Sequence, residues 1–219
     1  MERLPIETSC KQCVDKVGKF RCMDCFGQPL LCHSCCLEAH TSSPFHSIEK
    51  WTGSFFKKTS LNVEGFVLHL GHGGLCCPAN VTSATESEVA EAEEGDIVDE
   101  VLLEGWEPRD TRTLVIVDVS RVHQLSISWC CCPSAPDHAT QLFEHHLFPA
   151  STSRPSTAFT FSVLEYFHVD AVECKTSASS FSTKLRQLTD FSSPQSVPVS
   201  NSYTICYTWL MCPRIDIMN

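Results

Sequence analysis

Three Cys-x2-Cys pairs followed by two histidines constrain the fold of this chain more than any other feature. The pairs are Cys10 with Cys13, Cys22 with Cys25 and Cys32 with Cys35, and the histidines are His40 and His46. Two intervening residues let both thiolates of a pair bind one ion, and Zn²⁺ prefers four such sulfur or nitrogen ligands in a tetrahedron. Eight ligands therefore predict two closed, structural zinc sites. Thiolates favour zinc over calcium or magnesium, and the mixed set argues against an iron–sulfur cluster.

The assignment of these ligands to two ions has more than one solution. A sequential arrangement joins the first two pairs on one ion. The order of three pairs and then two histidines, at gaps of 8, 6 and 4 residues, resembles the B-box type of zinc domain. That resemblance implies a cross-brace, with Cys10, Cys13, Cys32 and Cys35 on one ion and Cys22, Cys25, His40 and His46 on the other. His33 and Cys36 are near enough to replace a neighbour, but Cys35 completes the two-residue gap from Cys32.

The cysteine content supports metal binding over disulfides. The chain has 15 cysteines in 219 residues, and in a cytosolic or nuclear protein such spacing is typical of metal sites. The competing interpretation is a set of buried free thiols with surface histidines, against which the regular spacing argues. Residues 8–48 have too few aliphatic side chains for a core of their own, so we expect them to unfold without metal.

A second group of cysteines and one histidine stands further along the chain. It consists of His72, Cys76, Cys77, Cys130, Cys131 and Cys132. In an extended segment Cys130 and Cys132 point to the same side, so these two thiols could bind a third metal ion together with His72 and Cys77. The alternative is a set of buried free cysteines beside Trp129 in a hairpin. Both interpretations are open at this point.

The remaining pattern predicts a small α+β domain. Residues 113–119 read as a buried strand, and apolar residues from Val122 to Trp129 predict a second strand, paired through a turn at residues 120–121. Residues 159–169 and 177–188 are expected to be helices, the latter capped by Ser177. The predicted core comprises Leu114, Ile116, Val119, Leu125, Ile127, Phe159, Phe161, Leu164, Phe167, Phe181 and Leu185. The fold class is thus a zinc-stabilised α+β chain, a B-box-like cross-brace module followed by a mixed hairpin and helix domain.

Charge is distributed unevenly. Between Glu86 and Glu107 lie ten acidic residues and no Lys or Arg, and without them 16 acids balance 16 bases. The net charge of −10 therefore reflects one segment, and no overall basic field indicates nucleic-acid binding. We expect a zinc module at 8–48, a second domain from 49–78 and 113–190, an acidic insertion or linker at 79–112, and a disordered tail at 191–219.

Several functional classes are disfavoured. No run approaches the roughly 20 apolar residues of a membrane span, and the first residues lack the apolar segment of a secretion signal. Nucleophile-elbow, phosphate-loop and dinucleotide motifs are absent, and the cysteines form chelating pairs. The sequence thus predicts no catalytic residue, no enzyme activity, no small-molecule substrate and no membrane partner.

Several blocks of sequence resemble one family. They are residues 20–27, 30–40, 44–51, 70–74 and 154–161, together with the step from Cys130 to Pro133. The chain resembles, from about Cys10 to Asp190, the CxC-type cysteine-cluster domain associated with KDZ (Kyakuja-Dileera-Zisupton) transposases. This resemblance implies a nuclear, zinc-binding accessory module of a DNA transposase. It carries over the eight N-terminal ligands and matches His72, Cys77, Cys130 and Cys132 to later family positions.

The chain departs from this family after Asp190. There the family continues into a catalytic domain, whereas this sequence turns into a Ser- and Pro-containing stretch. We expect a truncated copy without that domain, whose partner is transposon DNA, a transposase or another protein. The alternative is a B-box-like adaptor that binds proteins and has no DNA-related role. Cys76 and Cys131 add thiols beside the third group, which leaves its ligand register open.

Overall fold

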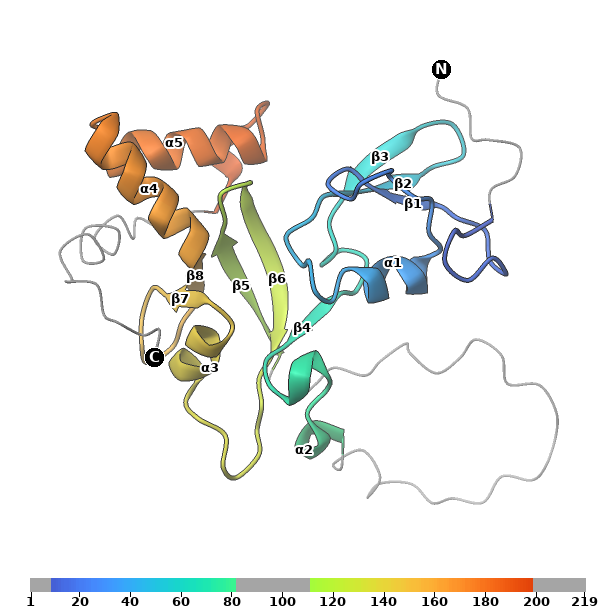
Figure 1. The fold of residues 1–219 in the computed structure, drawn as a ribbon, viewed down its shortest axis with the longest axis horizontal. Helices are drawn as coiled ribbons and strands as arrows, with labels where there is room; N and C mark the ends of the chain where they lie inside the picture. Colours follow the sequence, from blue (N-terminus) through green and yellow to red (C-terminus); the bar gives the residue numbers. More distant parts are fainter. Residues whose placement is uncertain (1–8, 82–110, 199–219) are drawn as a thin grey trace.

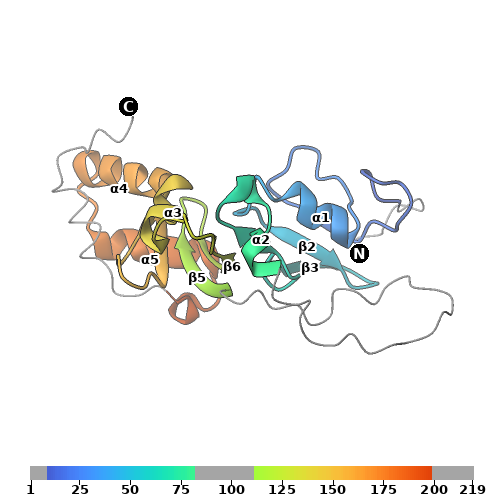
Figure 2. The ribbon, with the colours of Figure 1, turned by 90° about the horizontal axis from the view of Figure 1, so that it is seen from below.

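Two β-sheets and several short helices form the part of the chain that the computed structural model describes, residues 9–81 and 111–198 (Figure 1). This mixture confirms the predicted α+β class. The N-terminal sheet carries helix α1 beside it, and the second sheet carries α4 and α5 (Figures 1 and 2). No helix within the described residues combines the length and apolar character that a bilayer crossing requires.

The N-terminal sheet contains the antiparallel strands β1 (Phe20–Cys22), β2 (Ile48–Trp51) and β3 (Phe56–Thr59), in that order. Phe20, Cys22 and Ile48 are buried; the register pairs Cys22 with Ile48 and places Phe20 two residues before Cys22, so all three share one face. Helix α1 (His33–Ala39) adds the buried Cys35 and Cys36. Thiol groups therefore make up much of this small interior.

The second sheet is mixed and has the order β4-β6-β5-β8-β7. Its strands are β4 (Val67–His69), β5 (Thr111–Val117), β6 (Val122–Ser128), β7 (Leu147–Pro149) and β8 (Thr157–Thr160). Strands β5 and β6 are antiparallel, with Val117 opposite Val122, which confirms the predicted hairpin. The outer pairings are parallel between β4 and β6 and between β5 and β8.

Both faces of the hairpin are covered. Leu114 and Ile116 belong to a core that includes the cysteines of the N-terminal module and Leu142 of α3 (His138–Glu144). The intervening Val115 and Val117 pack instead against the core formed by α4 (Phe161–Glu173) and α5 (Ala178–Thr189). A strand buried on both sides is expected to read as an unbroken apolar run, and this explains the run from Leu114 to Val117.

Both predicted helices are present, but α4 (Phe161–Glu173) begins and ends later than the predicted residues 159–169. Helix α5 begins after Ser177, whose hydroxyl accepts the N–H of Ser180 at 3.1 Å, so the predicted cap is confirmed. Helix α4 begins at Phe161 and not at residue 159, because Thr157–Thr160 forms strand β8. Thr160 then caps α4 by accepting the N–H of Val163 at 3.2 Å.

One predicted core residue is wrong. Val119 lies in the turn between β5 and β6 and is 38% exposed; the strand ends at Val117, so its alternation does not continue that far. Phe161 is half-buried, while Leu164, Phe167, Phe181 and Leu185 are buried as expected.

The acidic segment between Glu86 and Glu107 lies outside the described residues. Helix α2 (Pro78–Val81) and the start of β5 occupy the two ends of the predicted linker. Of the predicted tail, residues 191–198 are described and include a 3-10 turn, η2 (Pro194–Ser196), and the buried Val197. The remainder, 199–219, lies outside.

Candidate metal centres

Site A is a group of four cysteines, Cys10, Cys13, Cys32 and Cys35, whose sulfur atoms all lie within 4.8 Å of one another. Cys32 occupies the N-cap position of α1 and Cys35 lies in its first turn, so the helix start directs both thiols to one point. The Sγ atoms of Cys13 and Cys32 are 3.9 Å apart. The first and third pairs are thus brought together, as in a cross-brace.

The loop that holds the first pair is tight. The N–H of Cys10 donates to the carbonyl of Lys16 at 2.7 Å, and the N–H of Val14 donates to the carbonyl of Cys10 at 2.9 Å. Val14 has a φ of 66°, a left-handed conformation that is costly for a β-branched residue.

Site B joins the second cysteine pair to the two histidines. The ligand atoms of Cys22, Cys25, His40 and His46 lie within 4.8 Å of one another. Nδ1 of His46 is 3.5 Å from Sγ of Cys22 and 3.4 Å from Sγ of Cys25, and Nε2 of His40 is 3.8 Å from Sγ of Cys25. Cys22 ends β1, His40 follows α1 and His46 precedes β2, so three elements meet here.

A backbone hydrogen bond selects the tautomer of His40. Its Nδ1 is 2.6 Å from the carbonyl oxygen of Cys36; a carbonyl only accepts, so Nδ1 must carry the hydrogen. The lone pair of the neutral ring is then on Nε2, the atom that faces Cys25. Metal-ligating histidines are commonly oriented in this way. Burial lowers the pKa of His40, which keeps the ring neutral and able to bind a cation.

Site C gathers residues from widely separated segments. It consists of His72, Cys77, Cys130 and Cys132, with ligand atoms again within 4.8 Å of one another. Nε2 of His72 is 3.3 Å from Sγ of Cys130 and 3.4 Å from Sγ of Cys132, and Sγ of Cys77 is 3.7 Å from that of Cys132. His72 lies in the 3-10 turn η1 (His72–Gly74), and the last two cysteines follow β6.

Three further residues position site C. Gly71 has a φ of 110°, and a Cβ on it would lie 2.9 Å from Cβ of Cys130, so only glycine allows this approach. The side chain of Gln141 on α3 accepts the N–H of Cys130 at 2.9 Å and donates to its carbonyl at 3.1 Å. Asn80 donates to the carbonyl of Trp129 at 3.2 Å.

The spacing of these atoms fits tetrahedral zinc. From Zn–S and Zn–N bond lengths, the expected separations in a tetrahedron are about 3.8 Å between two sulfurs and about 3.6 Å between sulfur and nitrogen. The shortest sulfur–sulfur separations, 3.7–3.9 Å, and the shortest sulfur–nitrogen separations, 3.3–3.8 Å, lie close to these values, and every other pair lies within 4.8 Å. Each group offers four sulfur or nitrogen donors, so each could hold one metal ion with its coordination complete.

Within one site the pKa values of neighbouring thiols are shifted in opposite directions. Burial raises the pKa of Cys10, but hydrogen bonds from backbone N–H groups, including that of Cys13, bring it down to about 6. A hydrogen bond with Cys32 and burial raise the pKa of Cys35 to about 12. In site C the pKa of Cys77 falls to about 6 while that of Cys132 rises to about 11. Such a cluster keeps some of its protons until a cation replaces them.

The alternative ligands that the sequence offered lie outside the three sites. Nε2 of His33 is 2.8 Å from the carbonyl oxygen of Glu64, and Cys36 lies outside site A. Cys76 and Cys131 are likewise outside site C. Sequence reasoning named the twelve residues of sites A, B and C but missed Gln141 and Asn80. The sequence signal that could have placed Gln141 on a helix is the N-cap of α3. There the Asp137 carboxylate accepts the N–H groups of Ala139 and Thr140.

Comparison with known proteins finds a family model that matches part of the chain. Residues 105–193 match the family model described as CxC2 like cysteine cluster associated with KDZ transposases. This confirms the resemblance over that segment, which is less than half of the chain and includes Cys130 and Cys132. The search of curated proteins found no match. No solved structure matches the chain either.

Proposed function

We propose that this chain is a zinc-binding accessory domain of the KDZ transposase type, with a structural zinc ion at each of sites A, B and C. The observation that carries this proposal is the placement of four Cys or His ligand atoms within 4.8 Å at each site. Four protein ligands leave no position for a substrate or a reactive water. The metal would therefore supply folding free energy and the chain a recognition surface, without catalysis.

In this proposal sites A and B form a cross-brace of the B-box type. The variant Cys32→Ser tests it in protein loaded with Co²⁺. A cross-brace loses its four-sulfur site and keeps the site with two nitrogens and two sulfurs, whereas a sequential arrangement would keep the four-sulfur site. The intensity of the thiolate-to-cobalt absorption separates the two results, and the exposed Cys174, changed to Ser, is the control.

The family match and a set of unpaired lysines on and beside the N-terminal sheet support transposon DNA in the nucleus as the partner. Arg21 forms an ion pair with Glu49 at 2.7 Å, and Lys50 forms one with Glu64 at 2.9 Å. Five exposed lysines form no ion pair with a described residue; they are Lys11, Lys16, Lys19, Lys57 and Lys58. Phosphates are the partners that such free ammonium groups attract.

Binding to duplex DNA across a range of salt concentrations tests this partner. We expect binding at low salt, and a slope of log K against log salt that falls by about one for each phosphate contact removed. The variant Lys57→Gln with Lys58→Gln removes two such contacts. The double variant Arg154→Gln with Lys175→Gln removes equal charge from the other half of the molecule and should leave the slope unchanged.

A protein-binding adaptor is the second candidate. Helix α4 exposes Tyr166, Val169 and Val172, which are 48%, 58% and 49% accessible and lie three residues apart along one side of the helix. Exposed apolar side chains of this kind suit a protein partner. Absence of DNA binding at low salt would favour this function over the first.

A further inference from the structure

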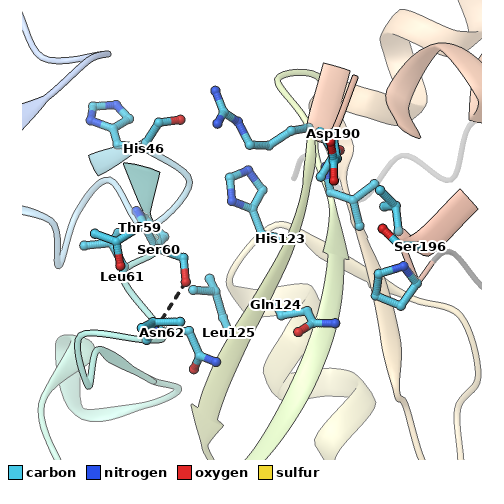
Figure 3. Close-up of a pocket in the computed structure, with 18 residues that line it drawn as sticks. His46, Thr59, Ser60, Leu61, Asn62, His123, Gln124, Leu125, Asp190 and Ser196 are labelled. Carbon is cyan, nitrogen blue, oxygen red and sulfur yellow. Dashed lines mark hydrogen bonds between the residues drawn. The ribbon is translucent and has the colours of Figure 1, made fainter. Parts of the chain in front are cut away.

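A cleft of about 370 Å³ lies between the N-terminal module and the start of β6. Figure 3 shows the His123 ring projecting from β6 toward the segments that carry His46 and Thr59. Pro44, residues 46–47 and residues 59–63 line one part of the cleft. Residues 121–125 line another, and residues 189–190 and 196–198 complete it. Ligand pockets span roughly 300–1,000 Å³, so this cleft has room for a small molecule or one unit of a polymer.

Two buried polar atoms of residues lining this cleft have no hydrogen-bond partner among the described residues. They are Nε of Arg121 and Oγ of Ser47. Buried polar side-chain atoms in folded proteins are nearly always paired. Arg121 comes from the β5–β6 turn and Ser47 from the loop before β2, so two unrelated segments each bring an unused donor to the same cleft. A ligand with several acceptor atoms could pair with both by displacing the side chains that cover them.

The nearby acids form no direct ion pair with Arg121 among the described residues. The two carboxylate oxygens of Asp118 accept hydrogen bonds from Thr160, and from the N–H and hydroxyl of Ser120. Oδ1 of Asp190 accepts the N–H groups of Ser192 and Ser193. The Arg121 guanidinium itself forms no hydrogen bond or ion pair with a described residue, so its donors are unused although the Asp190 carboxylate also lines the cleft.

Of the other titratable groups near the cleft, the two histidines add no positive charge and Asp190 adds a negative one. Burial lowers the pKa of His123 to about 4, so its ring is neutral near pH 7. His46 faces site B, and Oδ2 of Asp24 accepts the N–H of Ser47 at 2.6 Å. Asp190 supplies the one acidic side chain of the lining, and it should weaken the binding of an anion.

We propose that this cleft binds a phosphate ester, with the guanidinium of Arg121 and the hydroxyl of Ser47 donating to its oxygens. An arginine fork matches phosphate and carboxylate geometry alike. A tetrahedral phosphate, however, directs its oxygens in several directions, which suits donors from two separate segments, whereas the two oxygens of a carboxylate lie in one plane. The source is a free nucleotide or a phosphate of a nucleic-acid strand.

Titration calorimetry on the full, reduced, zinc-loaded chain tests the proposal. The probes are adenosine 5′-monophosphate, adenosine, inorganic phosphate and succinate. We expect the monophosphate to bind and adenosine to bind at least about tenfold more weakly, the factor expected for a lost charged hydrogen bond. A 5′-phosphorylated single-stranded oligonucleotide that binds more tightly than the monophosphate would identify a strand as the source.

Matched variants separate a binding role from a structural one. Arg121→Gln should weaken monophosphate binding about tenfold or more without lowering the melting temperature, because the removed Nε has no partner in the folded chain. Arg154→Gln should leave the affinity unchanged. Ser47→Ala should weaken binding and Asp190→Asn should strengthen it, since the latter removes the acidic group from the cleft.

Three results would overturn the proposal. They are an absence of binding by every phosphate probe, equal affinities for adenosine and its monophosphate, and equal effects of the Arg121 and Arg154 substitutions. Tighter binding of succinate than of phosphate would also contradict it. The Lys57 and Lys58 experiment on duplex DNA is independent of all four, so failure of one proposal can be distinguished from failure of the other.

Discussion

Adjacent cysteines of α1 have different surroundings. Cys35 directs its sulfur into site A, whereas Sγ of Cys36 lies 3.9 Å from Nδ1 of His40, on the side of the ring away from site B. Burial raises the pKa of Cys36 to about 12, so this thiol stays protonated. A single position along the helix thus separates a candidate ligand from a core side chain.

Alanine substitutions of this pair test that distinction. We expect Cys35→Ala to lose one zinc ion per chain, because site A then keeps three ligands, and Cys36→Ala to retain every ion. Bound zinc is measured after exhaustive dialysis against zinc-free, reducing buffer. Loss of an ion from the Cys36 variant with retention in the Cys35 variant would show that the two roles are reversed.

The partly buried His123 should make stability depend on pH. Its pKa is about 4 in the folded chain, against an ordinary value of 6.5, so the unfolded chain binds more protons between these values. Stability is therefore fully present above pH 6.5 and is lost as the pH falls toward 4. Urea unfolding from pH 7 to pH 5 should show a smaller loss for His123→Gln than for the wild type.

The exposed His168 of α4, changed to Gln, is the matched control for this measurement. Both variants keep every ligand of sites A, B and C, so any release of metal at low pH affects them equally. Identical pH profiles for His123→Gln and the wild type would contradict the proposed contribution of His123.

At the scale of residues, the candidate ligands were the most predictable part of the site. Short-range spacing is enough to mark chelating pairs, since two intervening residues bring two sulfurs to one point. The groups that support site C were not predictable in the same way. The amide of Gln141 reaches Cys130 from another helix, and a contact of that kind leaves no periodic trace in the sequence.

Among the elements, the β5–β6 hairpin carries the largest share of buried apolar side chains in the sheet. Ile127 of β6 is 0% exposed, and its removal leaves a cavity between the sheet and the N-terminal module. We expect Ile127→Ala to lower the free energy of unfolding by about 2–5 kcal/mol. Val119→Ala in the turn of the same hairpin should change it by less than about 0.5 kcal/mol.

Chemical denaturation of the zinc-loaded variants measures both values. Equal destabilisation by the Ile127 and Val119 substitutions would contradict the placement of the core on the faces of the strands and outside the turn.

The elements that were predicted are those with strong local signals. The hairpin has an unbroken β-branched run, and α5 has both a cap at Ser177 and apolar residues at helical spacing. Strand β8 was taken for the first residues of α4, because all of Thr157–Thr160 is buried and no alternation marks it. Its parallel pairing with β5 joins segments far apart in the chain, which local pattern does not reveal.

In the molecule as a whole, metal sites and core are continuous. The cysteines of sites A and B share one buried cluster with Leu114, Ile116 and Ile127 of the second sheet. A hydrogen bond of 2.9 Å from the N–H of Ser126, in β6, to the side chain of Asn62, in the segment between β3 and β4, further connects the N-terminal segment to the second sheet. The sequence predicted two modules but not this shared core, because it depends on contacts between distant segments.

Removal of metal should therefore affect more than the N-terminal module. We expect a strong chelator to abolish the folded structure of residues 9–48, since their binding free energy is folding free energy, and to lower the melting temperature of the remainder. Far-ultraviolet circular dichroism with and without chelator, under reducing conditions, measures both effects. An unchanged spectrum and melting temperature in metal-free protein would be inconsistent with structural zinc.

The central claim is that sites A, B and C each hold zinc. Native mass spectrometry of the purified, reduced chain tests it most directly, because the mass gives the number of ions per molecule. Three zinc ions are predicted, falling to two in Cys77→Ser and in Cys35→Ala. Two ions in the wild type would show that site C is a group of ordinary thiols, and folded protein without any zinc would contradict the account.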